Sequence, residues 1–432
     1  MLKNQTNSTA ATTIPTQHCI DDTIKLLCEG YLYIPNRMRK YNTNLFKTRL
    51  LCQKVTCISG EQAAKLFYDK NLFTRKGVIP KRIQETLFGK RGIQTLVGAE
   101  HLDRKKLFMS LLGPGKFHEL VQLTKKQWEM AGPHYVKQNQ ILLFDEASFL
   151  MFYVACKWSG VPITKTKAKQ RAKDMSTMID AFGAVGPRHI LGRCARNRSE
   201  LWAMQLIDKV RSGKLLPPKS SPLYIIAMHK DTSGNLLSSK VAGVELLNIL
   251  RPITAIATYI TFGALSLHMY PKLKEKLKQA DEEYLTMFSQ EVRRFYPFGP
   301  FLGAKVRVNF AWNNHQFHKG DLVFLDIYGT NHDLKSWKNA TIFSPENFRN
   351  HKENPYDFIP QGGGDHMSGT RCPGEWITIE LLKVSLEYLA KNLEYDVPLQ
   401  DLTYSLRRIP TLPKSKFLMT NVRIVANSPN LP

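Results

Sequence analysis

One cysteine in this sequence is placed for chemistry. Cys372 lies in the stretch PQGGGDHMSGTRCPGEW, Pro360–Trp376, between a glycine-rich loop and an apolar-periodic run that predicts a helix. Glycines let backbone N–H groups approach a buried anion, and the positive end of the helix and Arg371 favour a thiolate over a thiol. Such a sulfur can serve as a nucleophile or as a metal ligand. A buried structural cysteine at a helix cap is the alternative.

A second pattern favours the metal ligand. In FSQEVRRFYPF, Glu291 and Arg294 stand three residues apart and therefore on one face of a helix. The segment PENF, Pro345–Phe348, lies between that helix and Cys372. A single cysteine ligand suits haem, whose ring supplies the other four in-plane ligands. The order of these motifs resembles the haem-thiolate cytochromes P450, which implies haem b, Cys372 as its axial iron ligand, and a structural role for Glu291 and Arg294.

Three departures from the usual P450 pattern narrow the resemblance. The loop between the glycines and Cys372 is long, and the central helix reads LLNILRPITA, without the acid–alcohol pair that ordinarily delivers protons to dioxygen. Arg251 and Pro252 occupy the middle of that helix. Together with PKRIQETLFGK and RRFYPF, these features resemble the bacterial fatty-acid peroxygenases. The resemblance implies a long-chain fatty acid as substrate, hydrogen peroxide as oxidant and no obligatory redox partner.

Arg251 carries the proposed chemistry. An arginine within an apolar helix is costly to desolvate unless an anion pairs with it, and a structural salt bridge to an acidic residue is the alternative. Pro252 is expected to interrupt the helical hydrogen bonds and open the backbone beside Arg251. The guanidinium would hold the substrate carboxylate, and that carboxylate would act as acid and base in hydroxylation at the alpha or beta carbon.

Other activities stay open at this point. A peroxide-driven decarboxylase would give terminal alkenes, and a conventional monooxygenase would draw electrons from redox partners. A non-catalytic haem-thiolate sensor is a further alternative. Relatives that mainly decarboxylate often carry histidine where this sequence has Gln94, a neutral amide that favours hydroxylation. The alternative for Gln94 is a loop residue that binds backbone groups.

Further site residues follow from the resemblance. Phe88 is expected near haem and substrate, and Asn248, one turn before Arg251, is expected in the pocket above the haem. Phe298 and Phe301 are candidates for the acyl channel, although core packing explains them equally well.

The haem edge has its own candidates. His101 and Lys105 are four residues apart on one helical face and resemble the pair that binds the haem propionates. Arg371 is placed beside the cofactor through its neighbour Cys372. One mismatch is that the usual Pro-Glu-Arg-Phe has become PENF, so Asn347 replaces the arginine partner of the Glu291–Arg294 pair.

The elements around these residues predict a mainly α-helical protein with small β-sheets. Helical periodicity dominates from about residue 95 to 280, and AKVRVNFAW and DLVFLDIYG predict strands after Pro297. We expect a disordered polar tail over residues 1–18 and a single cytochrome P450 domain over 19–432. The haem would lie between the long central helix and the cysteine loop.

Composition limits the remaining classes. The 61 Lys and Arg residues exceed the 36 Asp and Glu residues, giving a net charge of +25, but the bases are scattered, which disfavours nucleic acid as a partner. The seven cysteines make no CxxC pair. The apolar segment Ile253–Met269 contains three threonines and a histidine and indicates a buried helix rather than a membrane span. The N-terminus lacks the apolar core of a signal peptide, and a cytoplasmic location is expected.

Overall fold

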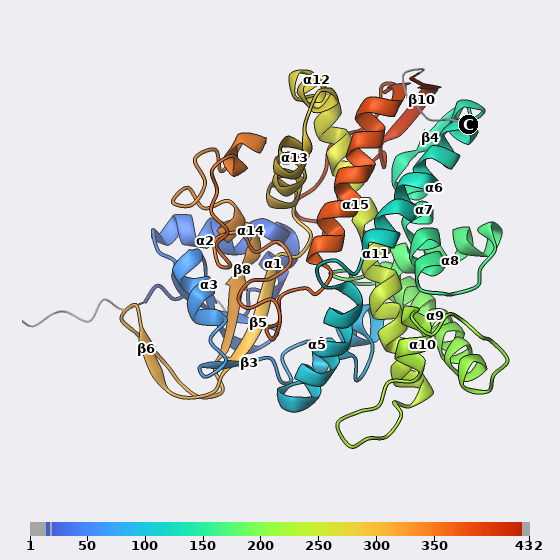
Figure 1. The fold of residues 1–432 in the computed structure, drawn as a ribbon. Coiled ribbons are helices and arrows are strands. Elements are labelled where there is room, and N and C mark those ends of the chain that lie inside the picture. Colours follow the sequence, from blue (N-terminus) through green and yellow to red (C-terminus); the bar gives the residue numbers. More distant parts are fainter. Residues whose placement is uncertain (1–13, 18–19, 426–432) are drawn as a thin grey trace, which may run out of the picture.

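The computed structural model describes residues 14–17 and 20–425. Helices fill one side of the molecule and most strands gather on the other (Figure 1). The helices are α1 (Thr23–Glu29), α2 (Tyr33–Tyr41), α3 (Glu61–Phe67), α4 (Lys81–Ile83), α5 (Gly98–Leu112), α6 (His118–Val136), α7 (Leu143–Trp158), α8 (Lys165–Asp180), α9 (Pro187–Arg211), α10 (Pro222–Ala227), α11 (Ser239–Met269), α12 (Pro271–Lys278), α13 (Glu282–Phe295), α14 (Ile327–Asn331) and α15 (Glu375–Glu387).

The strands form three sheets. The largest has the order β1-β2-β8-β5-β3, in which β2 and β8 are parallel and the other neighbours antiparallel. The other two have the orders β4-β10-β9 and β6-β7. The strands are β1 (Leu45–Leu50), β2 (Gln53–Ile58), β3 (Phe73–Thr74), β4 (Gln140–Leu142), β5 (Phe301–Val306), β6 (Phe310–Trp312), β7 (His315–Phe317), β8 (Leu322–Asp326), β9 (Leu393–Asp396) and β10 (Leu418–Ile424).

Helix α11 is the central element of the core. It packs against α7, α8, α9 and α15, and its first turn is capped by Ser238, whose hydroxyl accepts from the Val241 N–H at 3.3 Å. The helix has the length and apolar composition of a membrane span, and 83% of its apolar window is buried inside the protein. This confirms the prediction that Ile253–Met269 belongs to a buried helix.

The predicted interruption at Pro252 is wrong at the level of secondary structure. Helix α11 runs through Pro252 without a break. The missing proline N–H removes only the bond that the carbonyl of Asn248 would otherwise accept. Packing on several sides of the helix stabilises it enough to tolerate that loss.

Short breaks refine the other expectations. The predicted strand AKVRVNFAW divides into β5 and β6, and DLVFLDIYG changes from β8 to α14 after Asp326, whose carboxylate caps the helix. The mainly helical architecture with small sheets is confirmed. Within the predicted tail, Thr16 bridges to Lys47 of β1, so order begins before residue 19; residues 1–13 lie outside the described residues.

Candidate active site

The cysteine loop ends at the start of α15. Gly374 is the N-cap of this helix, so Cys372 stands two residues ahead of the cap. The Cys372 N–H donates to the Gln361 carbonyl at 3.1 Å, and the Glu375 N–H donates to the Cys372 carbonyl at 3.4 Å. Burial raises the pKa of the Cys372 thiol, and the Gly374 N–H and the Gln361 side chain offset this only in part.

The Gly374 N–H at the helix start favours the thiolate, as expected, but burial has the larger effect. Desolvation of the sulfur outweighs its hydrogen bonds, so the thiolate requires a further positive charge. A metal ion supplies that charge, because a coordinating thiol is deprotonated outright. The environment of Cys372 thus fits a metal ligand better than a free nucleophile.

Arg371 is not the cation that faces the sulfur. Its Nε binds Glu375 Oε2 at 2.6 Å, and Glu375 also accepts from Arg293 Nη2 at 2.5 Å. The nearby positive charge that lowers the pKa of Cys372 belongs to Lys105, whose Nζ donates to the Arg371 carbonyl at 2.6 Å. The Arg371 side chain is paired with Glu375, and its role as a cofactor residue stays a prediction.

Lys105 belongs to a cluster of cations at one edge of this loop. Burial lowers its pKa to about 8, and burial followed by the charge of Lys105 lowers the pKa of His101. Arg75 also contributes to this effect on His101. Among the described residues, no carboxylate lies within 4.0 Å of Lys105 or Arg75, so this edge can receive anions from a cofactor. Arg75 escaped sequence reasoning because no motif marks it.

The glycine loop and α11 carry further features that bear on the cofactor. A Cβ on Gly364, whose φ is +76°, would come within 3.0 Å of the Tyr68 side chain, so this turn requires glycine. Along residues 242–267 of α11, Pro252 and Ala255 keep accessible surface while the others are buried. The thiol, the cation cluster and the glycine loop together fit haem b. Cys372 would be its iron ligand, with His101, Lys105 and Arg75 at its propionates.

Arg251 lies on the same helix, one turn before Ala255. Its side chain is 4% exposed, and Nη1 donates to the carbonyl of Leu87. The guanidinium carbon is 5.7 Å from the centroid of the Phe88 ring. Burial lowers the pKa of Arg251 to about 9, and the charge of Arg196 acts in the same direction.

Arg251 has no ion-pair partner in the part of the chain that the structure describes. The nearest acid on its helix, Glu245, is fully buried and pairs with Arg104. Glu245 also accepts from Asn248 Nδ2 at 2.9 Å. The alternative of a structural salt bridge for Arg251 is therefore absent from the described residues.

Gln94 and Asn248 come together beside this arginine. Gln94 lies in the turn η3 (Ile93–Thr95) and accepts from Asn248 Nδ2 at 3.3 Å. The Asn248 Oδ1 atom is buried without a hydrogen-bond partner among the described residues. Asn248 lies one turn before Arg251 on α11, so its hydrogen bond connects Gln94 to the part of the helix that carries Arg251.

The three aromatic candidates lie in different surroundings. Phe88 lies at the end of the π-helical turn η2 (Gln84–Phe88), with its ring near Arg251, and its place beside haem and substrate stays a prediction. The Phe298 ring is 6.0 Å from that of Tyr259 of α11. Phe301 stacks on Phe324 at 4.7 Å and packs against the core cluster of α2, β1 and β2. Core packing, rather than an acyl channel, therefore describes Phe301.

Glu291 and Arg294 form the predicted pair in α13. Both are buried, with Arg294 Nε donating to Glu291 Oε2 at 2.7 Å and Nη1 donating to the carbonyls of Asn331 and Ala340. The mismatch at PENF proves partly compensated. Asn347 Nδ2 reaches the two Glu291 oxygens at 3.3 and 3.4 Å.

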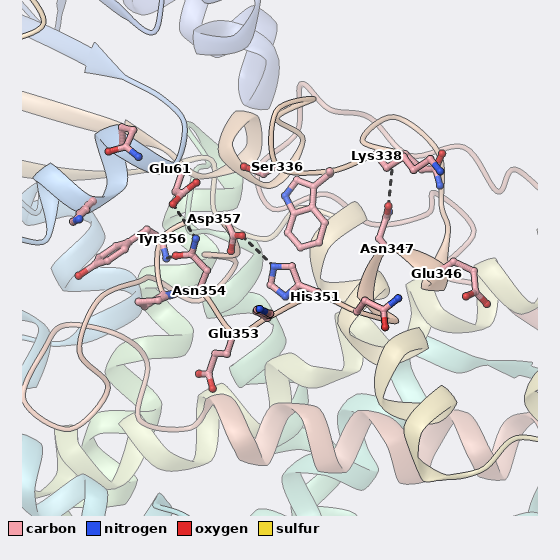
Figure 2. Close-up of a pocket in the computed structure, with 17 residues that line it drawn as sticks. Glu61, Ser336, Lys338, Glu346, Asn347, His351, Glu353, Asn354, Tyr356 and Asp357 are labelled. Carbon is pink, nitrogen blue, oxygen red and sulfur yellow. Dashed lines mark hydrogen bonds and ion pairs between the residues drawn. The ribbon is translucent and has the colours of Figure 1, made fainter.

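A polar pocket of about 920 Å³ lies beside Asn347 (Figure 2). Its lining comes from α3 and from residues 336–357, and none of the candidate catalytic residues lines it. His351 Nε2 lies 3.1 Å from Asp357 Oδ2 in its wall. Glu353, also in the wall, lies 3.8 Å from Arg371 Nη1 of the cysteine loop.

Comparison with known proteins matches this geometry. The family model "Cytochrome P450" matches residues 276–420. Among curated relatives, protopanaxadiol 6-hydroxylase of Panax ginseng is 24% identical over 84% of this chain and 81% of its own length.

Solved structures are more similar. Cytochrome P450EX alpha (CYP152N1) with myristic acid has 42% identity and a TM-score of 0.91, covering 96% of this chain and 100% of that one. A variant of cytochrome P450 OleT in complex with arachidonic acid has 36% identity and a TM-score of 0.94 at the same coverage. Haem b held by a cysteine thiolate is the cofactor of this fold. The chain belongs to the fatty-acid peroxygenase family of the haem-thiolate cytochromes P450.

Proposed function

We propose that this enzyme uses hydrogen peroxide to hydroxylate long-chain fatty acids at the alpha or beta carbon, with Arg251 binding the substrate carboxylate. One observation carries the proposal. Arg251 is a buried cation on the helix that faces the cysteine loop, and no carboxylate of the described chain neutralises it. A desolvated guanidinium binds a carboxylate bidentately and strongly.

The chain offers few other groups for moving protons beside Arg251. The Thr254 hydroxyl donates to the carbonyl of Leu250 at 2.8 Å, and Glu245 is occupied by Arg104 and Asn248. The substrate carboxylate is then the acid–base group. It accepts a proton from one oxygen of hydrogen peroxide and returns it to the oxygen that leaves as water. The balanced reaction converts a C–H bond and hydrogen peroxide into an alcohol and water.

Haem b supplies the oxidising chemistry when bound to Cys372, whose thiolate donates electron density that favours O–O cleavage. Lys105, His101 and Arg75 would hold its propionates. The Gly374 N–H and the Gln361 side chain reach the Cys372 sulfur and stabilise its negative charge.

Gln94 favours hydroxylation over decarboxylation. A neutral amide is a poor proton donor, and its oxygen already accepts from Asn248. Terminal alkenes are the products of the alternative reaction. Of the two structures compared, one holds myristic acid and the other arachidonic acid, which favours a long-chain acid as substrate here. We expect peroxide alone to sustain turnover in the cytoplasm, without a redox partner.

The test is an incubation of the holoenzyme with myristic acid and hydrogen peroxide, without any reductase. We expect 2-hydroxy or 3-hydroxy acid by mass spectrometry. Turnover that requires NADPH and electron-transfer proteins would instead identify a conventional monooxygenase, and alkene as the main product would identify a decarboxylase. The Arg251→Ala variant should keep the haem absorption spectrum and lose turnover of long-chain acids. Tetradecanol, which lacks the carboxylate, should be a poor substrate for both proteins.

A further inference from the structure

The carbonyl of Leu87 accepts from two buried guanidinium groups. Arg251 Nη1 donates to it from α11, and Arg196 Nη1 donates to it from α9 at 2.8 Å. Leu87 is itself buried and belongs to the turn η2, which packs against α9. One backbone oxygen therefore connects the proposed carboxylate-binding arginine to a second arginine on another helix.

The Arg196 side chain is buried and fixed by hydrogen bonds. It is 1% exposed, and its Nε binds Glu200 at 2.7 Å. The Nη2 atom is buried and has no hydrogen-bond partner among the described residues. A Cβ at Gly89, whose φ is +84°, would collide with this Nη2, so the chain uses glycine to let the guanidinium approach the turn.

Arg196 is buried and paired with Glu200, yet its charge still acts on Arg251. Burial lowers the pKa of Arg196, and the Arg196 charge lowers that of Arg251. An uncharged donor could bind the Leu87 carbonyl at a lower desolvation cost than a buried guanidinium. The Glu200 carboxylate is partly exposed and offsets the Arg196 charge only in part, so the two guanidinium groups still repel each other, and a bound anion would relieve that repulsion.

We propose that Arg196 is a positioning residue for carboxylate recognition, an inference that rests on the proposed function. It fixes the Leu87 carbonyl to which Arg251 is anchored, while its own charge is shared with Glu200. The charged groups that face Arg251 are Arg196 from α9, Glu245 from α11 and Cys372 from the loop before α15. Glu245 is compensated by Arg104 and Arg196 is paired with Glu200, so among the described residues Arg251 is the cation of this group without a carboxylate partner.

The experiment compares Arg196→Met, Arg196→Gln and the control Arg198→Gln in the holoenzyme. Arg198 is a neighbouring, exposed cation of α9 that pairs with Asp174 of α8 and, within the described part of the chain, does not bond to η2. Calorimetric titrations use myristate and its neutral analogue tetradecanol. We expect Arg196→Met to weaken myristate binding roughly tenfold, because the charge-assisted hydrogen bond that fixes the Leu87 carbonyl is lost. Tetradecanol binding should be unchanged. KM for myristate should rise more than kcat falls, and the control should match wild type.

A pH series separates the charge from mere packing. Wild-type myristate affinity should fall as pH rises through about 9, where Arg251 loses its proton. Without Arg196 that fall should move to higher pH, because the like charge is gone. Arg196→Gln keeps a donor for Leu87, so it decides the question if Arg196→Met unfolds. Unchanged myristate affinity and an unchanged pH profile in a folded variant overturn the inference. If wild type binds myristate and tetradecanol equally, the proposed function itself fails.

Discussion

Removing the charge of Arg251 should make the substrate-free enzyme more stable. Burial lowers the pKa of Arg251 from its usual high value to about 9, which at 1.36 kcal/mol for each pH unit corresponds to a cost of about 5 kcal/mol for keeping Arg251 charged in the fold. The bond to the Leu87 carbonyl returns about 2 kcal/mol. Arg251→Met should therefore raise the free energy of unfolding by about 3 kcal/mol at pH 7, since methionine fills similar space without a charge.

The pH dependence follows from the sign of the shift. Below pH 9 Arg251 is protonated in both the folded and unfolded states, so the full cost is present. Above pH 9 the unfolded chain keeps a proton on Arg251 that the folded chain loses, and the wild-type protein regains stability as pH rises. The advantage of Arg251→Met should consequently shrink above pH 9.

Urea unfolding of holoenzyme without fatty acid, followed by circular dichroism at pH 7 and pH 9.5, measures both effects. Added myristate should stabilise wild type and leave Arg251→Met unaffected. The matched control is Arg294→Met, which breaks a buried ion pair with Glu291 and should destabilise by about 3–5 kcal/mol. If Arg251→Met loses stability to the same degree as this control, Arg251 is a structural residue and our account of the site is refuted.

Three further outcomes are expected. Lys105→Met should accelerate haem loss to apomyoglobin roughly tenfold, because a buried cation at the propionate edge is removed. Gln94→His should raise the ratio of alkene to hydroxy acid in product analysis, because imidazolium donates a proton that an amide cannot; an unchanged ratio argues against a role for Gln94. Asn347→Arg should increase the free energy of unfolding by about 1 kcal/mol in urea, since a guanidinium entering the adjacent pocket replaces the long Asn347–Glu291 contacts. A loss of stability would show that the pocket does not accept it.

The features that depend on residue spacing within one segment could be predicted from the sequence. The position of Cys372 before a helix, the pairing of Glu291 with Arg294 and the burial of α11 all follow from residue spacing within one segment. The continuous helix at Pro252 does not, because packing from neighbouring helices decides whether a proline breaks a buried helix.

The parts that escaped prediction depend on contacts between distant segments. Arg371 stands next to Cys372 in sequence, yet its charge goes to Glu375 while that of Lys105, far away in the chain, faces the sulfur. Arg196 reaches Leu87 across 109 positions in the chain. Nothing in the residues around Arg196 distinguishes it from the other arginines of α9.

The pairing of the buried cations explains why the two ligand sites lie where they do. Most lysines and arginines buried among the described residues have a carboxylate within 4.0 Å: Arg37, Arg104, Arg196, Arg293, Arg294 and Lys383. In the same part of the chain, Lys105 and Arg251 are buried without one. A buried charge that the chain does not neutralise must be neutralised by a ligand, or it costs several kcal/mol. Lys105 contacts the cysteine loop, and Arg251 lies on α11, which faces that loop. The two unpaired charges therefore need two different carboxylates as partners. We assign the first to haem and the second to the fatty acid.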